Sequence, residues 1–152
     1  MLRGAAQACN DARMSGFDTE QLHRLVPFSD ELGIRLVAAE PAAVRLELDW
    51  QARLCTAGGV LHGGALMSLA DTAGAVSAVL NLPDGATGTT TVDSTTNLLA
   101  AVREGTVSAL ATPLHAGRTL IVVETELRDG RGKLVAKTTQ TQAVLRPPPA
   151  SG

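Results

Sequence analysis

A glycine-rich segment that leads into one long apolar helix constrains this 152-residue chain more than any other feature. From Ala65 to Leu80 the sequence lacks proline and is rich in alanine and leucine, which are strong helix formers. Small or apolar residues lie on nearly all sides of the predicted helix, which indicates that it is buried. Proline and turn residues in Asn81–Gly85 end it. Because it also contains glycine, serine and aspartate, the helix is a poor candidate for a membrane span.

The acid Asp71 lies about two turns inside this helix and requires a partner or a chemical task. At the helix start, His62-Gly63-Gly64 offers unpaired backbone N–H groups, which can hold a carbonyl oxygen that becomes negative during acyl transfer. Asp71 can then act as a nucleophile or a general base. Taken alone, the glycines also suit a tight turn, and Asp71 also suits a structural pairing within a helix interface.

Gly63 and Asp71 are too far apart on one helix to act on the same bond. Their separation of eight residues corresponds to about 12 Å along the helix axis. Two copies of the helix, antiparallel about a two-fold axis, would place Gly63 of one chain beside Asp71 of the other. A reaction that uses both groups therefore predicts at least a dimer.

The rest of the sequence predicts an antiparallel sheet that packs against this helix, an α+β arrangement. A short helix capped by Asp18 or Thr19 runs to Leu25 and ends at Pro27. We expect residues 1–16 to form a loose or weakly helical leader, and the proline-rich tail 147–152 to fray. From alternation and β-branched content, strands are predicted at Leu32–Ala39, Val44–Asp49, Thr87–Leu98, Thr106–His115, Thr119–Leu127 and Lys133–Leu145.

Composition excludes several classes of function. A net charge of −2 gives no basic surface for nucleic acid, and 2 % aromatic residues give no stacking platform for single strands. Cys9 and Cys55 form neither a disulfide framework nor a zinc pattern, and no metal site is expected. Two lone cysteines, with no apolar run typical of a secretory signal, favour a reducing cytoplasm.

A longer pattern points to a family. The run Gly59-x-x-His62-Gly63-Gly64-x-x-x-x-Leu69-x-Asp71-x-Ala73 resembles the signature of the hotdog-fold acyl-CoA thioesterases, in the branch of the PaaI-like and 4-hydroxybenzoyl-CoA thioesterases. The resemblance extends from about Leu32 to Arg146 and implies one hotdog domain over residues 17–146. In that fold a long central helix is wrapped by a curved antiparallel sheet, and active sites lie between subunits. The resemblance therefore implies a dimer as the minimal active unit and a tetramer formed by pairing two such dimers.

The resemblance also implies roles for individual residues. The N–H of Gly63 would polarise the thioester carbonyl, and Asp71 would be the catalytic carboxylate that reaches across from the other subunit. His62 would support the loop or line the site. Thr91, in Thr91-Val92-Asp93, matches a Ser/Thr-Val-Asp strand whose hydroxyl helps to place the water.

Substrate binding is implied for further positions. Gly64 would contact substrate at the helix start, and Thr56 occupies a position where the family often carries Asn or Gln. Thr56 hydrogen-bonds over a shorter reach, which indicates a different substrate or a slower enzyme. Coenzyme A arrives as part of the substrate, so no separate cofactor is expected. Its phosphates need positive charge, for which Arg118 and Arg103 are candidates.

Four alternatives remain open at this stage. Asp71 can direct water at the thioester or attack it to form an anhydride. A non-catalytic acyl-CoA sensor on the same fold would explain Thr56. A hotdog hydratase or dehydratase would use His62 as a catalytic histidine that faces an acid across the interface. Cys55 and His62 can also be imagined as a nucleophile pair, although a buried cysteine is usually a small apolar residue.

Overall fold

The computed structural model describes residues 16–147. The predicted leader 1–16 and tail 147–152, together with Cys9, lie outside this range except for Gly16 and Pro147. In chain order the elements are α2 (Thr19–Leu25), α3 (Pro27–Leu32), β1 (Arg35–Glu40), β2 (Ala43–Asp49), the 3-10 helix η1 (Ala52–Leu54), α4 (Gly63–Leu80), β3 (Gly88–Leu98), β4 (Thr106–Ala116), β5 (Leu120–Arg128) and β6 (Leu134–Leu145).

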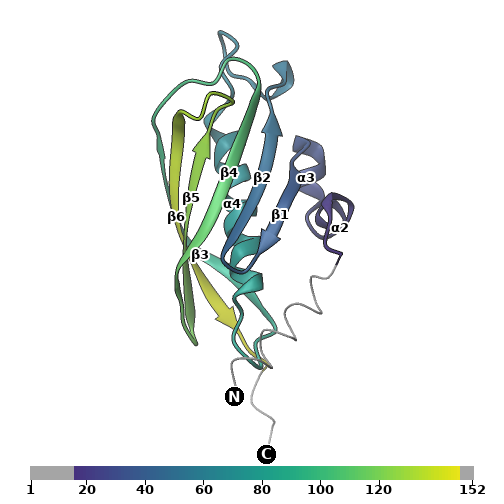
Figure 1. Cartoon of the computed structure of the whole chain (residues 1–152), viewed down its shortest axis with the longest axis vertical. Helices are drawn as coiled ribbons and strands as arrows, with labels where there is room; N and C mark the ends of the chain where they lie inside the picture. Colours follow the sequence, from purple (N-terminus) through teal and green to yellow (C-terminus); the bar gives the residue numbers. More distant parts are fainter. Residues whose placement is uncertain (1–15, 148–152) are drawn as a thin grey trace, which may run out of the picture.

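The six strands form one sheet in the order β1-β2-β4-β5-β6-β3, and every neighbouring pair is antiparallel (Figure 1). All six predicted strands are present, with ends that differ by a few residues. The first strand after α4 does not pair with the second. Instead β3 crosses to the far side of β6, so β1 and β3 are the two edges.

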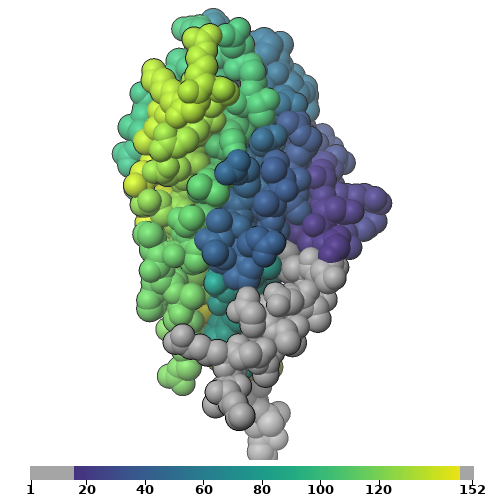
Figure 2. All heavy atoms as spheres, in the orientation of Figure 1, coloured from purple at the N-terminus to yellow at the C-terminus, as the bar shows by residue number. Residues whose placement is uncertain are grey.

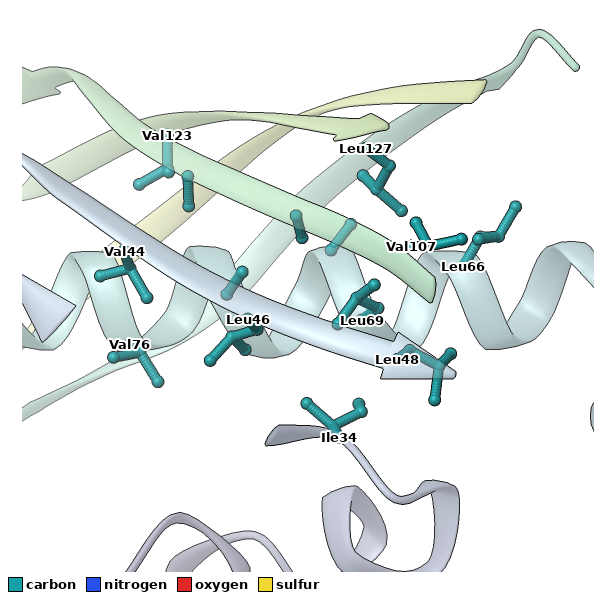
Figure 3. Packing of buried hydrophobic residues seen from close by; sticks show 14 of the residues in the cluster. Ile34, Val44, Leu46, Leu48, Leu66, Leu69, Val76, Val107, Val123 and Leu127 are labelled. Carbon is teal, nitrogen blue, oxygen red and sulfur yellow. The ribbon is translucent and has the colours of Figure 1, made fainter. Parts of the chain in front are cut away.

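The helix α4 packs on one face of this sheet and contacts all six strands. Leucine and alanine on its inner face, among them Leu69 and Ala73, are fully buried. In Figure 3, Leu66, Leu69 and Val76 of α4 lie close to the inward side chains of β2 and β4. One central helix under an antiparallel sheet is the α+β hotdog arrangement that the sequence predicts.

Within residues 16–147, α4 is the one helix that is long and apolar enough to cross a membrane by length and composition. However, 61 % of this segment is buried inside the molecule. Its apolar surface therefore belongs to the protein core, as its contacts with the six strands indicate.

The N-terminal part contains a second helix that the sequence analysis missed. Asp18 caps α2 as predicted, because its carboxylate accepts a hydrogen bond from Gln21 N at 2.9 Å. Pro27 follows the end of α2 but also begins α3, since its fixed φ and missing N–H suit the first helical position. Gly33 ends α3 with φ +75°, so Leu32 is helical and the next strand starts only at Arg35. Both helices lie beside β1 at one side of the molecule (Figure 1), and their residues form the purple to dark-blue part on that side of the space-filling view (Figure 2).

An ion pair joins β1 to β2. The guanidinium of Arg35 donates to both carboxylate oxygens of Asp49, at 2.5 and 3.1 Å, and Thr106 donates to the same carboxylate at 2.6 Å. The hydrogen bonds from Arg35 and then Thr106 lower the pKa of Asp49, and the bond to Asp49 raises the pKa of Arg35. Stability from Asp49 is therefore present above the pKa of an unfolded aspartate and is lost as the pH falls through its lower folded-state pKa.

Leu69→Ala tests how strongly the fold depends on α4. Leu69 is fully buried between helix and sheet, so we expect the free energy of unfolding to fall by about 2–5 kcal/mol. Urea unfolding followed by circular dichroism measures this loss. Leu114→Ala, at a leucine that is 59 % exposed on β4, is the matched control and should change stability by about 0.5 kcal/mol or less. Equal effects of the two variants would contradict the assigned core.

Candidate functional site

The loop before α4 is fixed by hydrogen bonds from both sides. Gly58 and Gly59 have φ of +83° and +70°, a left-handed conformation that favours glycine. The indole of Trp50 donates to Gly59 O at 3.0 Å, and Arg103 Nη1 donates to Gly58 O at 2.8 Å. The backbone of His62 is in turn bonded to Leu54 O at 2.9 Å. The start of α4 therefore has a defined position.

His62 is the N-cap of α4. Its Nδ1 accepts a hydrogen bond from Gly64 N at 2.8 Å, so the N–H of Gly64 is already occupied. For the N–H of Gly63, no acceptor is found among residues 16–147. Of the two glycine N–H groups at this helix start, Gly63 is thus the one left for a bound oxygen.

Gly63 lines a hollow of about 350 Å³ that is also lined by Thr56, Leu66 and Leu98. A Cβ at position 63 would lie 2.5 Å from Leu98 Cδ1, so glycine here lets the Leu98 side chain pack close to the backbone. Thr56, which is predicted to bind substrate, and Gly63, which is predicted to polarise the thioester carbonyl, therefore share one surface. Gly64 lies in a neighbouring hollow with His62 and Cys55.

Asp71 is exposed on α4 and is held by polar side chains from two strands. Its Oδ1 accepts a short hydrogen bond from Gln140 Nε2 of β6. Thr91 Oγ1 of β3 lies 3.5 Å from the same oxygen. Gln140 Nε2 and Gln142 Nε2 donate to Thr91 Oγ1 at 3.1 and 2.8 Å. The structure thus brings Asp71 and Thr91 together and adds the two glutamines.

Asp71 also borders an apolar cleft of about 370 Å³ between α2 and α4. Apart from Asp71 and Thr72, its lining is apolar: Phe17, Leu22, Leu25, Val26, Ala75, Val76 and Val79. A carboxylate at the edge of an apolar cleft suits a ligand with an apolar group beside a reactive polar centre.

Within one chain, Asp71 lines the apolar cleft and Gly63 lines a different hollow. They remain about 12 Å apart along α4, because the helix is continuous from Gly63 to Leu80. One chain therefore carries two separate candidate half-sites, one at Gly63 and one at Asp71. Gly63, Met67 and Asp71 follow one another at spacings of four residues, so they lie within about 80° of the helix circumference, on one side of the helix.

The two candidate arginines lie at opposite ends of the molecule. Arg103 is bonded to the loop before α4, and its hollow of about 440 Å³ shares Ala101 with the hollow at Gly63. Arg118 lies in the turn between β4 and β5, where its carbonyl is 3.5 Å from Arg146, which also reaches Asp84 beyond the end of α4. With α4 about 27 Å long, the two arginines of one chain cannot contact one phosphate group together.

Other candidate chemistry has no geometric support in the part of the chain that is described. The thiol of Cys55 donates to Gln51 O at 3.3 Å, and His62 Nδ1 is occupied by Gly64, so no hydrogen bond joins this cysteine to this histidine. Among the described residues, no group of three His, Cys, Asp or Glu side chains is placed to hold a metal ion.

Gln140 and Gln142 are the site residues that sequence reasoning missed. All six residues of Lys137–Gln142 are polar, so alternation does not reveal which of them face inward. The available signal is Gly74 inside the helix: a Cβ there would lie 1.9 Å from Gln140 Oε1. A glycine in a helix interior costs stability and therefore indicates a close approach from a neighbouring element.

The fold is that of known thioesterases. A thioesterase from Haemophilus influenzae superposes with a TM-score of 0.79 at 30 % identity, over 90 % of this chain and 96 % of that chain. A mutant thioesterase from Pseudomonas aeruginosa gives 0.78 at 30 % identity, over 86 % and 95 %. ComA2 of Bacillus subtilis (strain 168) is 37 % identical over 120 residues, which are 77 % of this chain and 93 % of ComA2.

The family follows from the sequence match as well. Residues 58–136 match the model of the Thioesterase superfamily, a range that includes Gly63, Asp71 and Thr91 and ends before Gln140. The chain belongs to the thioesterase superfamily.

His62→Ala tests the cap. Loss of the bond to Gly64 N should lower the free energy of unfolding by about 1 kcal/mol, whereas His62→Asn keeps a capping side chain and should stay close to wild type. Chemical denaturation of the three proteins measures the difference. An equal loss in both variants would mean that the imidazole stabilises the loop in some way other than capping.

Proposed function

We propose that this protein hydrolyses an acyl-CoA thioester to a carboxylic acid and coenzyme A. The observation that carries the proposal is the pair of half-sites on one helix face: a free N–H at Gly63 and an exposed carboxylate at Asp71. Each group is positioned by its own set of hydrogen bonds, and together they supply an electrophilic and a basic contact for a thioester.

In the proposed reaction the thioester carbonyl oxygen accepts a hydrogen bond from Gly63 N of one subunit. Asp71 of the other subunit removes a proton from water, and the water oxygen bonds to the carbonyl carbon. The negative charge that develops on the carbonyl oxygen is stabilised by the Gly63 N–H. The C–S bond then breaks, and the thiolate of coenzyme A takes up the proton. The variant pathway, attack by Asp71 itself to give an anhydride that water hydrolyses, uses the same geometry.

A two-fold dimer is part of this proposal. If Gly63 lies opposite Asp71 in an antiparallel helix pair, position 67 lies opposite itself, on the axis. Met67 occupies that position and is 45 % exposed in the isolated chain. The edge strand β3, eleven residues long, is also uncovered on the side away from β6 among the described residues, and such an edge favours pairing with another chain. Both features support an interface along this face.

The position of the substrate follows from the hollows. The apolar cleft beside Asp71 suits an acyl group without charge, either aromatic or of medium length. The hollow at Gly63 and Thr56 would take the thioester end of the coenzyme A arm. Because that hollow shares the lining residue Ala101 with the hollow that Arg103 lines, we favour Arg103 for a phosphate contact, while Arg118 would have to come from another subunit.

Release of free thiol from a panel of acyl-CoAs tests the activity. The panel contains phenylacetyl, hydroxybenzoyl, short-chain and medium-chain thioesters. We expect the wild type to hydrolyse at least one of them and Asp71→Asn to lose about a hundredfold or more in kcat, as expected for a general base or nucleophile. Asp84→Asn, at an exposed aspartate after the end of α4, is the control and should retain full activity.

Two outcomes would contradict this assignment. Equal activity of the wild type and Asp71→Asn would make Asp71 structural. A wild type that binds the acyl-CoAs but hydrolyses none would favour the sensing function, and Thr56→Asn would then be the variant to examine for gained activity.

Met67→Lys tests the dimer without altering a group that takes part in the reaction. Two lysines on the axis repel one another, so we expect the dimer to dissociate and activity to fall together with it. Sedimentation velocity at micromolar concentration measures the assembly, with Met67→Leu as the apolar control. A wild-type protein that is monomeric and fully active would refute a site shared between subunits.

A further inference from the structure

The inner face of β6 carries two buried glutamines beside Asp71. Gln140 and Gln142 are 0 % and 1 % exposed, and both aim their amide nitrogens at Thr91 Oγ1. Gln140 also donates to Asp71 Oδ1. Buried amides are costly unless they are hydrogen-bonded, so their placement at the one carboxylate of α4 calls for an explanation.

The orientation of the Gln140 amide is set by its surroundings. With Nε2 toward Asp71 and Thr91, the Oε1 faces Gly74 and has no hydrogen-bond donor among residues 16–147. The flipped amide would set Oε1 against the carboxylate of Asp71 and lose both donated bonds. The chain therefore leaves one buried oxygen unsatisfied in order to present an N–H to Asp71.

These bonds also fix the hydroxyl of Thr91. A hydroxyl oxygen has two lone pairs and one proton, and two amide N–H groups already occupy the lone pairs. Thr91 can then only donate. Its proton is available to Asp71 Oδ1, 3.5 Å away, or to a water molecule beside it.

The two oxygens of Asp71 therefore differ. Oδ1 is bonded to Gln140 and faces Thr91, whereas no hydrogen bond to Oδ2 is found in the described part of the chain. A water that accepts the proton of Thr91 and donates to Oδ2 keeps one lone pair free for a carbonyl carbon.

We infer that Gln140 and Gln142 are positioning residues, which make Thr91 a donor only and leave Asp71 Oδ2 as the atom that removes the proton from water. This inference rests on the proposed thioester hydrolysis. Gln140 acts on Asp71 and Thr91 together, whereas Gln142 acts through Thr91 alone. Gln142 therefore offers the clean test.

The test is a double-mutant cycle on Gln142 and Thr91. We expect Gln142→Met to lower kcat about tenfold, the kinetic equivalent of one lost hydrogen bond, with KM unchanged. In the Thr91→Val background there is no hydroxyl to orient, so Gln142→Met should lower kcat by no more than about twofold. Full additivity of the two losses would overturn the inference, because a structural role of Gln142 does not depend on the hydroxyl of Thr91.

A matched control comes from the same two strands. Thr138 of β6 is buried and shares a hydrogen bond of 2.8 Å with Thr96 of β3, away from Asp71. Thr138→Val should lower stability and leave kcat unchanged. Loss of kcat in this variant would show that any cut bond between β3 and β6 impairs the reaction, and the specific role of Gln142 would be refuted.

A second variant avoids dependence on Gln142→Met alone. Gln142→Glu keeps the size of the side chain but replaces the donor by an acceptor, so Thr91 would give its only proton to the new carboxylate. We expect a larger loss in kcat than in Gln142→Met, and an equal or smaller loss would refute the inference.

If Asp71→Asn is inactive while the cycle is additive, only this inference fails. If the wild type releases no thiol, the proposed function fails, and this inference with it.

Discussion

Burial of α4 under six strands fixes where everything else in this protein can lie. The sheet covers much of the helix, and Gly63, Met67 and Asp71 stay at least partly accessible along one side of it. Because an α-helix is rigid, the spacing between the free N–H and the carboxylate is set by residue number alone. The loop before the helix and the two strands β3 and β6 then adjust the local chemistry at each end of this fixed spacing.

The sequence was sufficient for the elements that depend on strong local patterns. An uninterrupted apolar run predicts α4, and alternating or β-branched residues predict all six strands. The position of β3 beyond β6 was not predictable, because sheet order depends on contacts between distant segments. Helix α3 was missed because Pro27 suits both the end of one helix and the first position of the next.

The residues of the candidate site also fall into those that the sequence pattern marks and those that it does not. Gly63, Asp71 and Thr91 are marked by a pattern of glycine, acid and hydroxyl residues at fixed spacing, and the matched family model includes all three. The N–H of Gly64 is bonded to His62 Nδ1, while the substrate contact expected of Gly64 stays a prediction. That bond depends on a side-chain rotamer, which residue types do not specify. Gln140 and Gln142 lie in a stretch where every residue is polar, so binary patterning carries no information about them.

The close contact between Gly74 of α4 and Gln140 of β6 limits which substitutions this protein can accept during evolution. A glycine within a helix and a buried oxygen without a donor both subtract from the stability of the fold. Apolar side chains at this contact would make the fold more stable to heat. The carboxylate of Asp71 would then lose the hydrogen bond that fixes its orientation. Adaptation to higher temperature is therefore constrained here, and we expect it to proceed through surface charges, loops and the far ends of the sheet.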